Sequence, residues 1–340
     1  MPWQLTTVLA RTARAVGLRR RWGGAAAVTR ANAIADREPR PGRDTVFARA
    51  AARATRRLPE ADRFALAKAV VDLDPGARAV MDRALASGAP IRALLALAHQ
   101  WPTVSESERA IAVSPLPLGD EGPVELDGVP ARQVDATTCG AASMAIMLMM
   151  GDPFVGAWVA SGRRFGGYLP PEIRAIPPQA RLDTVERRWG ALQKAIHLQT
   201  VRRGLLLLLP WPERLGTPPW RVNNATRFAG LAFRGAVVDD TDDADINALI
   251  SHASAALRDG IPVPIYASGD SAKGIDTVIP RHVVLLVRRL AEGFVAYEPG
   301  SARLYAITDD QIRQGGAGLR ALGNWSHVSW MILPRAQTRP

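Results

Sequence analysis

The sequence predicts an α+β protein in which helices come first and an antiparallel sheet follows. Up to about residue 259, apolar residues recur at helical spacing; beyond it they form short runs of strand length joined by tight turns. The chain has 340 residues, of which 47% are hydrophobic and 22% charged. It is therefore long enough for about two domains, and its composition argues against wholesale disorder.

Residues 1–45 are predicted to be a basic arm and linker. The first 60 residues contain 13 arginines and four acidic residues, so most of the net charge of +11 lies there and the rest of the chain is nearly neutral. The arm has little aromatic interleaving, so no nucleic-acid partner is expected, although basic charge alone suffices for phosphate contacts. Its weakly amphipathic start around Trp3 and Leu5 is either a frayed helix or a contact with a membrane surface.

Residues 46–125 are predicted to be a helical N-terminal region. Pro59 begins one helix, Pro75 separates two others, and Ser105 with Glu108 has the spacing of a capping box. Residues 113–130 are rich in proline and glycine, which favours a domain boundary there. The second domain is therefore assigned to residues 126–336, and the helical region is a candidate surface for a protein partner.

Three longer helices are expected in the second domain before the sheet begins. The first starts near Cys139 and is apolar on all sides, so it is predicted to be buried. The others cover about 183–200 and 244–259. The acidic run at 239–245 lacks the glycine and final glutamate of a calcium loop and is interpreted as a loop with a helix cap.

Strands are expected after residue 260, and a capping box at Thr308 and Gln311 predicts a short helix before the last of them. The expected strands cover 263–268, 282–290, 293–299, 303–308 and 326–334. Segments 203–220 and 267–280 are expected to line the site described next.

Cys139 is the only cysteine, which excludes a disulfide framework and any metal site built on several thiolates. Its place at a helix N-terminus is typical of a reactive thiol, because the helix dipole and a histidine partner both stabilise a thiolate. Gly140 leaves room for a substrate to approach. The side-chain amide of Gln133 is a candidate donor to an oxyanion, together with the backbone N–H of Cys139.

His282 opens an apolar strand and is the candidate base. Glu298 follows 16 residues later, at the end of the next strand. A hairpin centred near Leu290 places the two residues opposite each other and on one face, where the carboxylate orients the imidazole.

The order Gln133, Cys139-Gly140, His282 and Tyr297-Glu298-Pro299 resembles the papain-like cysteine peptidase superfamily. The nearest branch is similar to the bacterial peptidases that process double-glycine leader peptides. Over about 126–335, the resemblance implies a two-lobed fold with a Cys helix in one lobe and a sheet in the other. It also implies peptidase activity, with Gln133 at the oxyanion, Cys139 as nucleophile, His282 as acid and base, and Glu298 as the orienting residue.

Two residues depart from the family pattern: Glu298 stands where Asp or Asn is usual, and Thr138 where the leader-peptidase branch often has Asp. The expected function is therefore a thiol hydrolase that cleaves an amide bond of a peptide or acyl substrate without cofactor or metal. Two alternatives stay open: an acyltransferase on the same fold, and an inactive module that binds a protein. No apolar run approaches the ~20 residues that span a bilayer, so a cytoplasmic location is expected.

Overall fold

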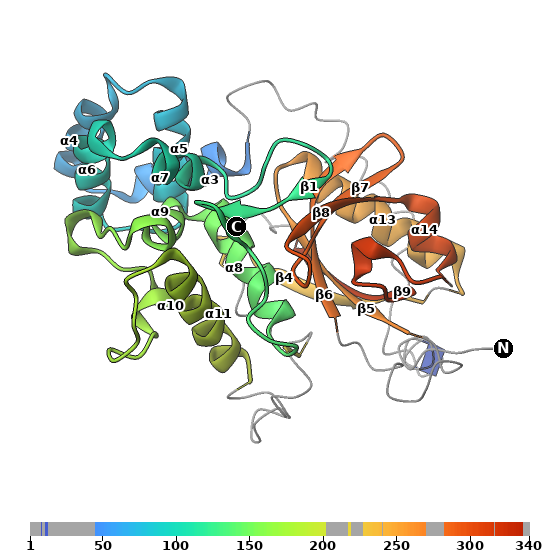
Figure 1. The fold of residues 1–340 in the computed structure, drawn as a ribbon. Coiled ribbons are helices and arrows are strands. Elements are labelled where there is room, and N and C mark those ends of the chain that lie inside the picture. The colour runs from blue at the N-terminus through green and yellow to red at the C-terminus, as the bar shows by residue number, and fades with distance from the viewer. Residues whose placement is uncertain are drawn as a thin grey trace.

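A computed structural model describes residues 8, 11–12, 45–201, 217–218, 227–239, 241–269, 282–315 and 317–335. These residues form an α+β structure in which an N-terminal helical region precedes a seven-stranded antiparallel sheet (Figure 1). The basic arm predicted at 1–45 lies outside the described residues apart from four positions. The same holds for most of the two expected site walls.

The N-terminal region contains the helices expected between residues 46 and 112. They are α3 (Val46–Arg57), α4 (Glu60–Val70), α5 (Pro75–Ala86), α6 (Ile91–Gln100), the 3-10 turn η1 (Trp101–Thr103) and α7 (Glu106–Val113). Asp74 and Ser105 cap α5 and α7 by accepting hydrogen bonds from backbone N–H groups. The helices share an apolar cluster with Phe154 and Phe165, so they pack directly on the next part of the chain.

The following helices confirm the expected Cys helix and the two amphipathic helices after it. They are α8 (Cys139–Gly151), α9 (Pro153–Ser161), the 3-10 turn η2 (Phe165–Gly167), α10 (Pro171–Arg174), α11 (Val185–Val201), α13 (Asp243–Arg258), α14 (Asp309–Gln314) and the 3-10 turn η6 (Arg320–Leu322). Asp242 caps α13, as the acidic run predicted. Thr308 and Gln311 form the predicted capping box at α14. In Figure 1, α8 lies between the helical region and the sheet.

The large sheet has the strand order β1-β8-β7-β6-β5-β9-β4, and all neighbours are antiparallel. Its strands are β1 (Gly122–Pro123), β4 (Phe233–Val237), β5 (Val263–Ser268), β6 (His282–Leu290), β7 (Gly293–Glu298), β8 (Arg303–Thr308) and β9 (His327–Pro334). A separate two-stranded ribbon pairs β2 (Glu125–Leu126) with β3 (Val129–Pro130). The five predicted strands are confirmed, whereas the edge strands β1 and β4 were not predicted. β1 already belongs to the sheet, although it precedes the expected boundary at residue 126.

The register of the β6–β7 hairpin differs from the predicted one. Leu290 pairs with Gly293, so the turn is centred on Ala291 and Glu292 rather than on Leu290. That turn alone would place Glu298 opposite Leu285, on the face away from His282. A bulge at Val287 moves the register by one residue, so that Leu285 pairs with Tyr297 and Glu298 falls opposite Val284. His282 and Glu298 therefore share a face as predicted, but they lie diagonally rather than directly opposite.

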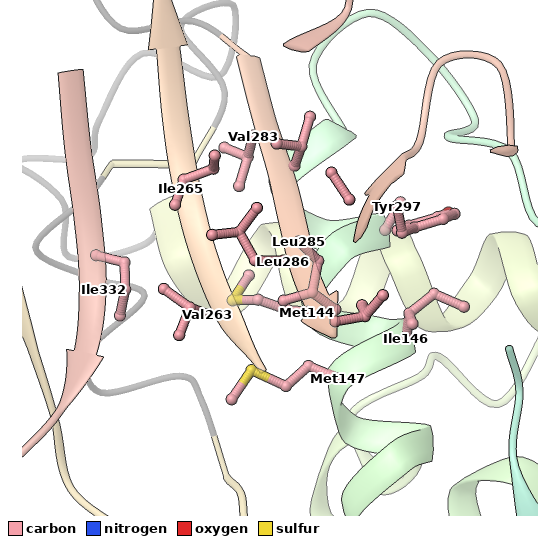
Figure 2. Packing of buried hydrophobic residues seen from close by; sticks show 14 of the residues in the cluster. Met144, Ile146, Met147, Val263, Ile265, Val283, Leu285, Leu286, Tyr297 and Ile332 are labelled. Atoms are coloured by element: carbon pink, nitrogen blue, oxygen red, sulfur yellow. The ribbon is translucent and has the colours of Figure 1, made fainter. Parts of the chain in front are cut away.

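The core fills the space between α8 and the sheet. Twelve of the 13 residues of α8 are buried, which confirms the all-round apolar pattern. Figure 2 shows Met144 and Met147 of α8 reaching toward side chains of β5 and β6. This contact holds the N-terminus of α8 against the start of β6, where the candidate site lies.

Candidate active site

Cys139 is the first residue of α8, and its side chain is buried at the junction of that helix with β6. The Ser143 hydroxyl, one turn further along, donates to the carbonyl of Val283 at 3.0 Å, and this bond ties the helix to the residue after His282. Thr138, at the N-cap, does not cap α8, because its hydroxyl is bonded to the backbone of Asp135. The first-turn N–H groups therefore face the site without a capping side chain between them and a ligand.

His282 lies between Cys139 and Glu298. Its Nε2 is 2.8 Å from Oε1 of Glu298, which leaves Nδ1 as the nitrogen that faces the thiol. Burial alone lowers the pKa of His282. The hydrogen bonds and charges of Cys139 and Glu298 outweigh that effect and raise this pKa to about 9. The ring is thus held as an imidazolium across the neutral pH range.

The Glu298 carboxylate accepts hydrogen bonds on both oxygens. Oε1 faces His282 and the backbone N–H of Gly300, while Oε2 accepts from the N–H and hydroxyl of Ser301. Burial raises the pKa of Glu298, but these donors and the charge of His282 lower it to about 2 overall. The carboxylate therefore stays ionised and fixes the imidazole ring.

Gln133 is positioned by its backbone. Its N–H donates to the carbonyl of Pro299, directly after Glu298, at 2.9 Å. Its side-chain amide nitrogen donates to the carbonyl of Asp135 at 2.8 Å, and Oε1 is buried with no hydrogen-bond partner within the described part of the chain. The second N–H of the amide is the donor that an oxyanion would use.

The Gln133 segment is held by residues that the sequence did not single out for this purpose. Trp189 and Gln193 of α11 both donate to the carbonyl of Arg132, and Gln193 Oε1 accepts from the N–H of Val134. The hydroxyl of Tyr297 donates to the carbonyl of Ala131. Gln193 is fully buried, so its amide needs these partners. In the sequence it is only a polar residue beside an apolar stripe, and nothing there signals this role.

Two further residues, Gly323 and Thr217, lie close to the candidate site residues. A Cβ atom added to Gly323, whose φ is +64°, would lie 2.5 Å from Nε2 of His282, so the backbone at this turn covers the ring edge. A Cβ atom added to Gly140 would lie 2.8 Å from the side chain of Thr217. Gly323 was missed, because its contact arises from a segment distant along the chain and no sequence pattern marks it. Thr217 falls in segment 203–220, which was expected to line the site.

The three candidate residues are shielded from solvent. Cys139 is 1%, Glu298 4% and His282 9% exposed. Water is thereby kept from competing for the hydrogen bonds that join them, and their electrostatic interactions are stronger than at the surface.

Neither a metal cluster nor a membrane span is found in the described residues. They contain no group of three or more His, Cys, Asp or Glu side chains arranged to hold a metal ion. Within these ranges no single helix is long and apolar enough to cross a bilayer; α8 and α9 reach that length only as a pair bent by 113°.

Comparison of the sequence with protein-family models and with curated proteins finds no match.

Proposed function

We propose that this chain is a thiol hydrolase that cleaves an amide bond of a peptide or acyl substrate through Cys139, His282 and Glu298, with a papain-like arrangement of the helical and sheet lobes. One observation carries the proposal: a cysteine at a helix N-terminus is hydrogen-bonded to a histidine whose other ring nitrogen is bonded to a buried carboxylate. Nucleophile, base and orienting group in this order are the elements of nucleophilic acyl transfer.

In the proposed mechanism, Sγ of the Cys139 thiolate attacks the substrate carbonyl carbon. A C–S bond forms while the carbonyl π electrons move to oxygen, and donors at the N-terminus of α8 stabilise that oxyanion. The C–N bond then breaks, and the leaving amine takes a proton from the His282 imidazolium. Water attacks the thioester, His282 takes one of its protons, and the carboxylic acid leaves as the thiolate is restored.

An acyltransferase would use the same first half of this reaction, with an amine or alcohol in place of water. The low exposure of Cys139, at 1%, favours the other alternative, a binding module whose thiol no substrate reaches. Chemical labelling separates this module from an enzyme, because a permanently covered thiol does not react. A cytoplasmic location, and contact of the N-terminal region with a protein or a membrane surface, stay predictions.

The first test is alkylation of Cys139 by iodoacetamide across a pH series in the wild type, in His282→Ala and in His99→Ala. An ordinary thiol with a pKa of about 8.5 is only about 0.3% thiolate at pH 6, so loss of the imidazolium is expected to slow alkylation there by up to ~10²-fold. His99 is exposed and remote in the fold, so its variant is the matched control. Equal rates in all three proteins, or an inert wild-type thiol, would contradict the proposal.

The second test concerns the reaction itself. Wild type and Cys139→Ser are incubated with a proteome-derived peptide library, and new peptide termini are identified by mass spectrometry. Cleavage that disappears in the Ser variant supports the peptidase. A thioester on Cys139 that persists until a nucleophile is added would indicate the acyltransferase instead.

A further inference from the structure

Thr217 lies against the first turn of α8, next to the proposed nucleophile. A Cβ atom on Gly140 would be 2.8 Å from both Cβ and Oγ1 of Thr217, so the hydroxyl faces the backbone that follows Cys139. Thr217 is 3% exposed. Because glycine has no Cβ atom, Gly140 lets the Thr217 side chain lie this close to the backbone of α8.

Tyr266 of β5 holds Thr217 in this place. Its hydroxyl donates to the carbonyl of Thr217 at 2.8 Å. Burial raises the pKa of Tyr266 well above its usual range, and the charge of Cys139 raises it further. The phenol thus keeps its proton and remains a donor while a thiolate is present nearby.

The Thr217 hydroxyl is buried without using its hydrogen-bonding capacity. Within the described part of the chain, Oγ1 has no hydrogen-bond partner. A buried hydroxyl without a hydrogen-bond partner destabilises the fold unless a ligand supplies that partner. The nearby end of α8 has no side-chain cap, so the N–H groups of its first turn are further hydrogen-bond donors close to this hydroxyl.

We infer that the Thr217 hydroxyl is a donor to the oxyanion formed at Cys139, in addition to Gln133; this inference rests on the proposed thiol-hydrolase function. As the Sγ–C bond forms and the carbonyl π pair moves to oxygen, the new anion accepts the Thr217 proton as a hydrogen bond, and no proton is transferred. The ligand class is therefore an ester, thioester or amide carbonyl, which passes through a tetrahedral intermediate.

Two reactions of the same thiol separate this role from packing. p-Nitrophenyl acetate acylates Cys139 through a tetrahedral oxyanion. The burst of released p-nitrophenolate measures the rate of this acylation. Iodoacetamide alkylates it by displacement at a saturated carbon, with no oxyanion. Because there is one cysteine, both signals come from residue 139. The variants are Thr217→Val, which keeps the shape, Thr217→Ser, which keeps the hydroxyl, and His282→Ala.

Thr217→Val is expected to slow acylation by about 10²-fold, as loss of an oxyanion donor does elsewhere, with alkylation unchanged. Thr217→Ser is expected to restore most of the acylation rate. Acylation that is unchanged in Thr217→Val, or an equal change in both reactions, would overturn the inference while leaving the hydrolase standing. A wild type that does not acylate, or acylates equally in His282→Ala, would overturn both.

Discussion

Glu298 helps to set the charge of the site through its Oε1 atom, which lies 2.8 Å from His282 Nε2. The folded-state pKa of His282, about 9, lies above its ordinary 6.5, so its contribution to the free energy of unfolding is complete below 6.5 and is lost as the pH rises through 9. The pKa of Glu298, about 2, lies below its ordinary 4.5, so its contribution is present above 4.5 and is lost as the pH falls through 2. Both contributions are complete between pH 4.5 and pH 6.5, so the pair stabilises the fold most in that range.

Glu298→Gln is expected to lower the pKa of His282, because the carboxylate charge disappears while the side-chain length is kept. NMR titration of the imidazole measures that pKa, and exposed Glu125→Gln is the control. An unchanged His282 pKa in the Gln variant would remove Glu298 from the proposed triad.

Glu298→Asp keeps the charge but draws the carboxylate back from His282 by about 1 Å. A displacement of that size is expected to lower turnover by ~10²-fold if the backbone does not correct it.

The turn after η6 forms part of the site because its backbone at Gly323 lies against the imidazole of His282. Gly323→Ala would bring a methyl group within 2.5 Å of Nε2 and 2.6 Å of Cδ2 of His282. We expect the ring to move and alkylation of Cys139 at about pH 6 to fall by ~10-fold or more, because the imidazolium supports the thiolate.

Gly230→Ala provides the matched control for this prediction. Gly230 has a similar φ of +67°, but an added Cβ meets nothing within 4 Å. Both variants are expected to lose about 1–2 kcal/mol in urea unfolding from left-handed strain, whereas only the Gly323 variant loses thiol reactivity. Equal reactivity in the two proteins would show that the turn does not position His282.

Local features of the fold could be predicted from the sequence, whereas the strand register and distant contacts could not. Helix caps at Asp242 and Thr308 were predictable, because capping uses residues within one turn. The β6–β7 register was not, because residues 282–287 of β6 are all buried and a strand covered on both faces has no alternation from which to read its bulge. The pairing of His282 with Glu298 was still predicted correctly, since the turn and the bulge together preserve their common face. Thr217 and Gly323 reach the site only through tertiary packing.

An ion cluster around the buried carboxylates Asp152 and Glu172 joins the N-terminal helices to the far end of α8. Arg227 donates to Asp152 at 2.7 Å, to both oxygens of Glu172, and to the carbonyl of Ser87 at the end of α5. Burial raises the pKa of Asp152, and Arg227 opposes that effect. The cluster thereby connects the helical region to the helix that begins at Cys139.

Arg227→Met is expected to destabilise the protein by about 3–5 kcal/mol, because two buried carboxylates lose their partner. The loss is expected to be smaller at about pH 5 than at pH 8, since burial raises the pKa of Asp152 and lets the folded state take up a proton there as the pH falls. Urea unfolding at both pH values measures it. Arg187→Met removes an exposed ion pair with Asp183 and is expected to leave the free energy of unfolding nearly unchanged, because solvent screens that pair. Equal losses in the two variants would contradict a structural role for the cluster.

β9 pairs with two strands, β4 and β5, that precede it in the chain. β9 is the last described strand, yet it lies between β5 and β4. During translation both neighbours emerge from the ribosome with unpaired edges, and they stay open until residues 327–334 follow. Nascent chains halted before that point are therefore expected to be the aggregation-prone species and to need a chaperone, because the sheet that carries His282 closes late in synthesis.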